Sequence, residues 1–355
     1  MAIAAIDLFC GIGGLTKGLE LSGINVVAGL DFESSCKYAY EENNNSIFIQ
    51  KDITTVTSDE IKQLYPKDTD IHILAGCAPC QPFSKYTHRY RKNGYKDEKW
   101  RLLYHFGRLI KELSPEIVTM ENVPELRKTT VFSDFEKELK NNGYSIASDV
   151  VFCPDYGVPQ KRKRLILLAS KLGNISIPPK THSEEKYVTV RDAIGDLPPL
   201  IAGSTDPHDI MHNSTALSDI NLKRIKQSVQ GGTWRDWNEE LQLTCHKKHT
   251  GKTYPSVYGR MNWDEPSPTI TTQFYGYGNG RFGHPEQNRA ISMREGAILQ
   301  SFPRDYKFVD STEIFNRRNL GTQIGNAVPV KLGEAIGKEI LNHIKEYYNG
   351  KKKNH

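Results

Sequence analysis

The sequence predicts an α/β protein with a doubly wound, mostly parallel sheet and a smaller, irregular second domain. In the first half of the chain, short apolar runs typical of buried strands alternate with segments of helical periodicity. After Pro178-Pro179 the chain changes to short segments rich in Gly, Thr, Trp and Tyr, with many turn signals. We therefore expect residues 1–182 and 316–355 to form the larger domain and residues 183–315 the smaller one.

Each predicted strand of the larger domain is followed by a glycine or a polar residue. Because ligands of open α/β sheets bind outside the carboxyl ends of the strands, we expect these residues to face a binding crevice. The apolar runs are Ile3–Leu8, Ile24–Leu30, Ile47–Lys51, Ile71–Ala75 and Ile117–Met120, and the residues at their ends are Gly11, Asp31, Asp52, Gly76 and Glu121-Asn122.

Composition indicates the class of protein and its compartment. The chain has 355 residues, of which 37% are hydrophobic and 25% charged, as in globular proteins of about two domains. No apolar stretch approaches the roughly 18 residues that a membrane span needs, and the first residues resemble a strand rather than a signal peptide. Six cysteines in such a chain indicate reduced thiols. We expect a cytoplasmic, monomeric protein.

The formal net charge of +5 is compatible with a nucleic-acid partner without requiring one, so local clustering matters more. Between Lys85 and Arg101 there are seven Lys or Arg residues, interleaved with three tyrosines and a tryptophan. A phosphate backbone favours such a segment through counterion release and stacking. A solvated surface loop has the same composition, so this alternative stays open.

Residues 7–15 form a glycine-rich turn from the first strand into a helix, which suits a nucleoside-type cofactor. The dinucleotide pattern is incomplete, because Thr16 stands where a third glycine would be. Asp31, twenty residues beyond Gly11, is placed to bind a ribose hydroxyl, and Asp52 to bind an adenine amino group. The alternatives are a turn without a ligand and ordinary aspartates at strand ends.

The loop 76–84 carries Cys77 and Cys80 and is stiffened by two prolines. Its C-x-x-C spacing allows a nucleophile, a redox pair, a metal ligand or a small buried residue. A structural zinc site needs about four ligands, and no second such motif occurs, so we expect no metal. A redox function for the two cysteines would not explain Glu121 or the glycine-rich turn.

Six segments in this order resemble the DNA (cytosine-5) methyltransferases, over about residues 3–340. They are Phe9-x-Gly11-x-Gly13-Gly14, Pro79-Cys80-Gln81, Glu121-Asn122-Val123, Gln160-Lys-Arg162-Lys-Arg164, Arg289 to Glu295, and Gly325-Asn326-Ala327-Val328.

The resemblance implies the methyltransferase fold, S-adenosylmethionine as cofactor and double-stranded DNA as partner. It implies that Cys80 attacks carbon 6 of a flipped-out cytosine, because adding a thiolate there turns carbon 5 into a nucleophile. Glu121 would then present a proton to ring nitrogen 3, with Arg162 and Arg164 as orienting cations. Strand alternation puts these two arginines on one face, and the lysines between them on the other.

The resemblance also implies two sets of binding residues. Those expected at the cofactor are Phe9, Gly11, Gly13, Gly14, Leu15, Asp31, Phe32, Asp52, Ile53, Pro79, Leu102, Asn326 and Val328. Those expected at DNA are Gln81, Ser84, Lys85, Arg89, Arg91, Thr269, Ile270 and Arg281. The smaller domain would be the target-recognition region.

Three other functions fit parts of the sequence. A tRNA cytosine methyltransferase of the same family would share most motifs, but should not need a recognition region of some 130 residues, given ordinary two-domain proportions. A thiol oxidoreductase would use Cys77 and Cys80. An inactive DNA-binding regulator would not need the full set of catalytic residues.

Overall fold

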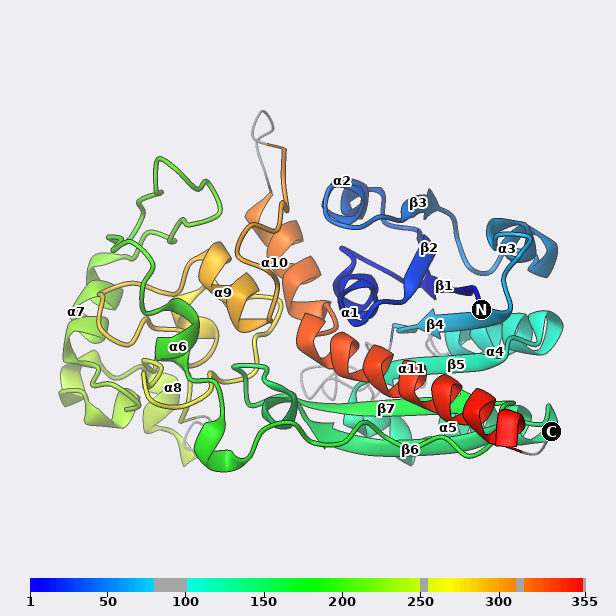
Figure 1. Ribbon diagram of the computed structural model, residues 1–355. Coiled ribbons are helices and arrows are strands. Elements are labelled where there is room, and N and C mark those ends of the chain that lie inside the picture. Colours follow the sequence, from blue (N-terminus) through cyan, green and yellow to red (C-terminus); the bar gives the residue numbers. More distant parts are fainter. Residues whose placement is uncertain (80–100, 250–254, 311–315, 354–355) are drawn as a thin grey trace. The chain divides into compact units, whose positions relative to one another are not determined.

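The computed structural model describes residues 1–79, 101–249, 255–310 and 316–353 (Figure 1). These form two compact units. The first unit comprises 1–152, 163–181 and 328–355, and the second comprises 153–162 and 182–327. The predicted boundaries at 182 and 316 differ from this division, because residues 153–162 and 316–327 belong to the second unit.

The first unit contains a seven-stranded sheet of order β3-β2-β1-β4-β5-β7-β6. The strands are β1 (Ile3–Leu8), β2 (Asn25–Asp31), β3 (Ile47–Gln50), β4 (Ile71–Gly76), β5 (Ile117–Asn122), β6 (Ser145–Phe152) and β7 (Lys163–Ser170). The first five pair in parallel, whereas β7 is antiparallel to both β5 and β6. The predicted doubly wound, mostly parallel sheet is therefore confirmed. Its strand order reverses between β1 and β4, which is where ligands of such sheets bind.

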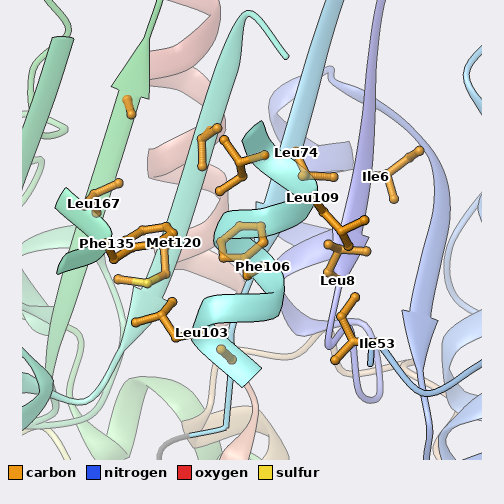
Figure 2. Packing of buried hydrophobic residues seen from close by; sticks show 14 of the residues in the cluster. Ile6, Leu8, Ile53, Leu74, Leu103, Phe106, Leu109, Met120, Phe135 and Leu167 are labelled. Atoms are coloured by element: carbon orange, nitrogen blue, oxygen red, sulfur yellow. The ribbon is translucent and has the colours of Figure 1, made fainter. Parts of the chain in front are cut away.

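Helices cover both faces of this sheet. They are α1 (Gly14–Ser22), α2 (Lys37–Glu41), α3 (Ser58–Leu64), α4 (Arg101–Leu113), α5 (Thr130–Asn141) and α11 (Val330–Lys353). Figure 2 shows Phe106 and Leu109 of α4 and Phe135 of α5 packed on one face, against apolar strand residues such as Leu74 and Met120. On the other face, α11 is tied to the sheet by a 2.8 Å hydrogen bond between His343 of α11 and Ser170 of β7.

Helices α1 and α11 pack unusually closely, because glycines face each other where they cross. The ideal position of a Cβ on Gly18 lies 2.5 Å from the Val330 carbonyl oxygen, so no side chain fits there. Gly333 of α11 lies directly against Gly18. This contact places α11, the last helix, against α1, the helix that follows the glycine-rich turn.

The second unit is built from short helices and irregular segments, as the change in sequence texture predicts. Its helices are α6 (Val190–Ile194), α7 (Asp219–Gln227), α8 (Thr244–Lys247), α9 (Met293–Leu299) and α10 (Arg317–Asn326). Its described residues form isolated bridges but no strand. A buried ion pair stabilises it, in which both terminal nitrogens of Arg289 lie 2.7 Å from the carboxylate oxygens of Glu295. The hydroxyl of Ser292 caps α9 beside this pair.

Among the described residues, no helix is long and apolar enough to cross a membrane.

We predict that Gly18→Ala lowers the free energy of unfolding by about 1–3 kcal/mol, because the added methyl group forces α1 and α11 apart. Gly350→Ala is the matched control, since no atom lies within 4 Å of the added Cβ on that helix. Urea denaturation of both variants measures the difference. Equal stabilities of the two variants would contradict the close contact.

Candidate active site

Three ionisable side chains come together because of the register of neighbouring strands. Gly76, the last residue of β4, pairs with Met120 of β5. The next residues along the two parallel chains, Cys77 and Glu121, therefore lie beside each other. On the other side, Glu121 pairs with Ile166 of the antiparallel strand β7. Arg164 lies two residues from Ile166 and therefore on the same face of the sheet. Cys77, Glu121 and Arg164 thus meet at the carboxyl ends of the parallel strands.

The carboxyl group of Glu121 is held from both sides. Its side chain is only 3% exposed, and Arg164 Nε lies 2.8 Å from Oε1 in an ion pair. The Cys77 thiol donates a hydrogen bond to Oε2, with sulfur and oxygen 2.8 Å apart. The next residue, Asn122, donates from Nδ2 to the Ala78 carbonyl at 2.9 Å. The end of β5 therefore anchors the beginning of the cysteine-bearing loop.

Burial dominates the electrostatics of this group. Burial raises the pKa of Glu121 above its ordinary value of 4.5, against the opposing effects of the Arg164 cation and the thiol hydrogen bond. Burial, together with the neighbouring carboxylate, also raises the pKa of the Cys77 thiol well above its ordinary range. Glu121 thus keeps a proton more readily than an exposed glutamate, and Cys77 stays a neutral thiol.

The glycine-rich turn has the backbone geometry of a ligand-binding loop. Gly11 and Gly13 have φ angles of 52° and 84°, in the left-handed region that favours glycine. Phe9 also has a positive φ of 62°, which is uncommon for an aromatic residue and marks a constrained backbone. Helix α1 follows at once, and its N-cap Gly13 supplies no side-chain cap to the first turn. The turn therefore leaves amide groups of the helix N-terminus available to a ligand.

The end of β2 provides a carboxylate beside an exposed aromatic ring. Asp31 accepts hydrogen bonds from the amides of Gly11, at 2.9 Å, and Glu33, at 3.0 Å. The adjacent Phe32 is 70% exposed, which is unusual for a phenylalanine without a partner. Asp52, after β3, is exposed and accepts from the Thr54 amide. This arrangement fits a nucleoside, with a carboxylate for ribose hydroxyls and a ring for stacking.

Asp7 is a candidate functional residue that was not predicted. It lies fully buried on β1 and accepts a 2.8 Å hydrogen bond from the Thr16 hydroxyl of α1. Its second oxygen, Oδ1, has no hydrogen-bond partner among the described residues. Burial raises its pKa from 3.8 to about 7. An aspartate interrupting an apolar strand was the signal in the sequence that could have identified it.

The remaining residues predicted at the cofactor differ in exposure. Leu15, Ile53 and Val328 are buried, whereas Pro79 and Leu102 are partly buried. Asn326 is exposed at the end of α10 in the second unit. Several predicted residues lie outside the part of the chain that the structure describes, namely Cys80, Gln81, Ser84, Lys85, Arg89 and Arg91.

Arg162 has different bonding partners from Arg164. The flanking Lys161 and Lys163 are exposed, in agreement with the predicted alternation. Arg162 is buried in the second unit, where it donates to the carbonyls of Ile270, at 2.9 Å, and Gly325, at 3.0 Å. The structure thus gives Arg162 a role in organising that unit, and its predicted role toward the base stays a prediction.

The three predicted DNA contacts of the second unit also make internal hydrogen bonds. Ile270 is fully buried, and its amide donates to Gln160. The Thr269 hydroxyl donates to the Lys161 carbonyl at 2.9 Å. The Arg281 guanidinium donates to the Gly231 carbonyl. These contacts stiffen the irregular backbone around them.

No group of three or more His, Cys, Asp or Glu side chains that could hold a metal ion occurs in the described ranges.

Solved structures of other proteins share this fold. The chain is similar to an Escherichia coli protein assigned as a prophage-encoded DNA modification methyltransferase, with a TM-score of 0.74, 24% identity, and coverage of 97% of this chain and 100% of the other. It is also similar to the Dnmt2 methyltransferase of S. pombe, with a TM-score of 0.64, 18% identity, and coverage of 96% and 99%. The fold is that of the S-adenosylmethionine-dependent methyltransferases.

Sequence comparisons define the family. Residues 3–342 match the model of the C-5 cytosine-specific DNA methylases, and the chain belongs to this family. It is 54% identical over 343 residues to the type II methylase M.HgiDII of Herpetosiphon aurantiacus, covering 96% of this chain and 95% of the relative. It is 34% identical over 357 residues to the type II methyltransferase M1.BsuMI of Bacillus subtilis, covering 93% and 78%. The chain is a DNA (cytosine-5) methyltransferase.

We predict that Asp7→Asn changes how stability depends on pH. With a native pKa of about 7 against 3.8 for the free side chain, native Asp7 keeps a proton that the unfolded chain has released. The free energy of unfolding of the wild type therefore falls as pH rises between these values, by at most about 1.4 kcal/mol per pH unit. The Asn variant lacks this contribution and should gain stability relative to the wild type as pH rises.

Urea denaturation at several pH values between 4.5 and 7.5 provides the measurement. Asp68→Asn, at an exposed position, is the control and should keep the slope of the wild type. Parallel stability curves for Asp7→Asn and the wild type would show that Asp7 is ionised in the native protein.

Proposed function

We propose that this protein methylates carbon 5 of one cytosine within a specific duplex sequence, as the modification enzyme of a type II restriction-modification system. The names of the two relatives support this proposal. The single observation that carries the chemistry is Glu121, a buried carboxyl with a raised pKa at the carboxyl end of β5. Such a group keeps its proton to a higher pH than an exposed glutamate does and can act as a general acid toward a ring nitrogen.

The proposed reaction begins with covalent attack. Carbon 5 of cytosine is a poor nucleophile, and a thiolate bond at carbon 6 converts the ring into an enamine. We assign Cys80 as the thiolate, on the resemblance of the 79–81 segment. Glu121 transfers its proton to nitrogen 3 as the sulfur–carbon bond forms. After methylation a water molecule takes the proton from carbon 5, the bond to carbon 6 breaks to release Cys80 as a thiolate, and the proton on nitrogen 3 returns to Glu121.

Arg164 supports this step from the neighbouring strand. Its ion pair keeps the carboxyl oriented while burial keeps the pKa high. Burial without a cation would leave the ionised form of Glu121 isolated in a medium of low polarity, which costs several kcal/mol. The pair thus allows Glu121 to cycle between its two protonation states.

The cofactor-binding residues fit S-adenosylmethionine. When bound, it supplies the methyl group that carbon 5 attacks. Asp31 would hold the ribose hydroxyls, Phe32 would stack on the adenine ring and Asp52 would accept from the adenine amino group. The backbone of the 9–14 turn would approach the remainder of the molecule closely.

The second unit is proposed as the target-recognition domain and the first as the catalytic domain. A base inside a duplex cannot reach a catalytic thiol, so the target cytosine would be flipped out at a cost of a few kcal/mol. Thr269, Ile270, Arg281 and the basic segment 85–101 are the proposed DNA contacts. A dithiol oxidoreductase is disfavoured, because the Cys77 thiol is hydrogen-bonded to a carboxylate that raises its pKa.

We predict that Cys80→Ala abolishes methyl transfer while cofactor binding and folding are retained. Duplex DNA with 5-fluorocytosine in the target should trap a covalent adduct with the wild type, because fluorine cannot leave carbon 5 as a proton does. Cys245→Ala is the control, since Cys245 is exposed in the second unit. Methylation by Cys80→Ala near the wild-type rate, or methylation without an adduct, would rule out attack by this thiol.

The same assay identifies the substrate. Labelled methyl groups should appear in duplex DNA, and bisulfite sequencing should locate them at one recurring sequence. Transfer to tRNA and not to DNA would contradict the proposed substrate while leaving the catalytic residues in place.

A further inference from the structure

We infer that Cys77 is a positioning residue for Glu121, holding its carboxyl in one orientation and determining which oxygen carries the proton. The inference rests on the proposed function of Glu121 as the proton donor. The observation behind it is geometric, since Cys77 Sγ lies 2.8 Å from Oε2 while Arg164 Nε lies 2.8 Å from Oε1.

The two oxygens of Glu121 have partners of different chemistry. Arg164 is a cation that only donates, so a proton on Oε1 would face a positive charge and is disfavoured there. A thiol is both a weak donor and a weak acceptor, so it can serve either form of the carboxyl. The proton of the acid form therefore belongs on Oε2, facing Cys77. The thiol then donates to the ionised carboxyl and accepts from the protonated one.

Cys77 does not fill the hydrophobic core. The apolar cluster beneath α4 includes its neighbours Leu74 and Ala78, whereas Cys77 is partly buried and directs its sulfur to a carboxylate. A cysteine retained only for packing would have apolar contacts around its sulfur.

Few ionisable groups of the described residues act on this pair. Glu121 is influenced by Arg164 from β7 and by Cys77 from the end of β4. The Cys77 thiol is influenced by Glu121, by Arg164 and by Asp7 of β1. Removing the thiol therefore changes one interaction of Glu121 and leaves its cation in place.

The test is the titration of Glu121 in Cys77→Ala, Cys77→Ser and the wild type, followed by carbon-13 NMR of glutamate-labelled protein and assigned with Glu121→Gln. The hydrogen bond to the ionised carboxyl is charge-assisted and stronger than the one that sulfur accepts from the protonated form, so its loss should raise the titration midpoint in Cys77→Ala, by up to about 1 pH unit. Cys77→Ser keeps a donor and should remain near the wild type. Cys36→Ala removes another buried thiol of the first unit and should change nothing.

An unchanged midpoint in Cys77→Ala would overturn the inference. If that variant does not fold, Cys77→Ser tests the same contact alone, because a hydroxyl that donates to the ionised carboxyl keeps the titration midpoint of Glu121 at or below that of the wild type. A midpoint in Cys77→Ser above that of the wild type would contradict the proposal.

The rate of methyl transfer as a function of pH separates this inference from the proposed function. If the midpoint moves and the pH–rate profile moves with it, Cys77 positions the proton donor. If the midpoint moves and the profile does not, Cys77 still controls Glu121, but Glu121 is not the proton donor.

Discussion

The ion pair between Glu121 and Arg164 is the interaction on which the candidate active site depends. A carboxyl that is 3% exposed needs a partner, and that partner comes from a strand running in the opposite direction. Had β7 been parallel to β5, its carboxyl end would lie at this edge and the start of the strand at the opposite edge. The antiparallel strand instead brings its first residues, including Arg164, to the edge where the parallel strands end.

Three other ionisable groups of the first unit come from the carboxyl ends of neighbouring parallel strands. Asp7 lies on β1, Asp31 ends β2 and Cys77 follows β4, so each carboxyl or thiol comes from a different strand. Their closeness in space follows from the parallel register and not from closeness in sequence. Burial then raises the pKa of Asp7, Cys77 and Glu121 together, which keeps protons at a site that carries several acidic groups.

Much of this could be predicted from the sequence, because short apolar runs with polar ends identify parallel strands and their ligand-binding edge. Strand β6 was not among the predicted runs, since Ser145–Phe152 mixes polar and apolar residues and gains its place by pairing with β7. The contact of Cys77 with Glu121 could not be predicted either. It depends on the register between β4 and β5, which no pattern within one strand encodes. Likewise, strand alternation places Arg162 and Arg164 on one face, yet Arg162 binds backbone carbonyls whereas Arg164 pairs with Glu121.

The proposed mechanism depends on proton delivery from the buried carboxyl of Glu121 to the cytosine ring. Its most direct test is the single-turnover rate of methyl transfer to duplex DNA by Glu121→Gln, which keeps the shape of the side chain but has no acidic proton. We expect a rate lower by about 10²–10⁴-fold, the usual contribution of general acid catalysis, with folding and cofactor binding preserved. A rate close to that of the wild type would contradict it.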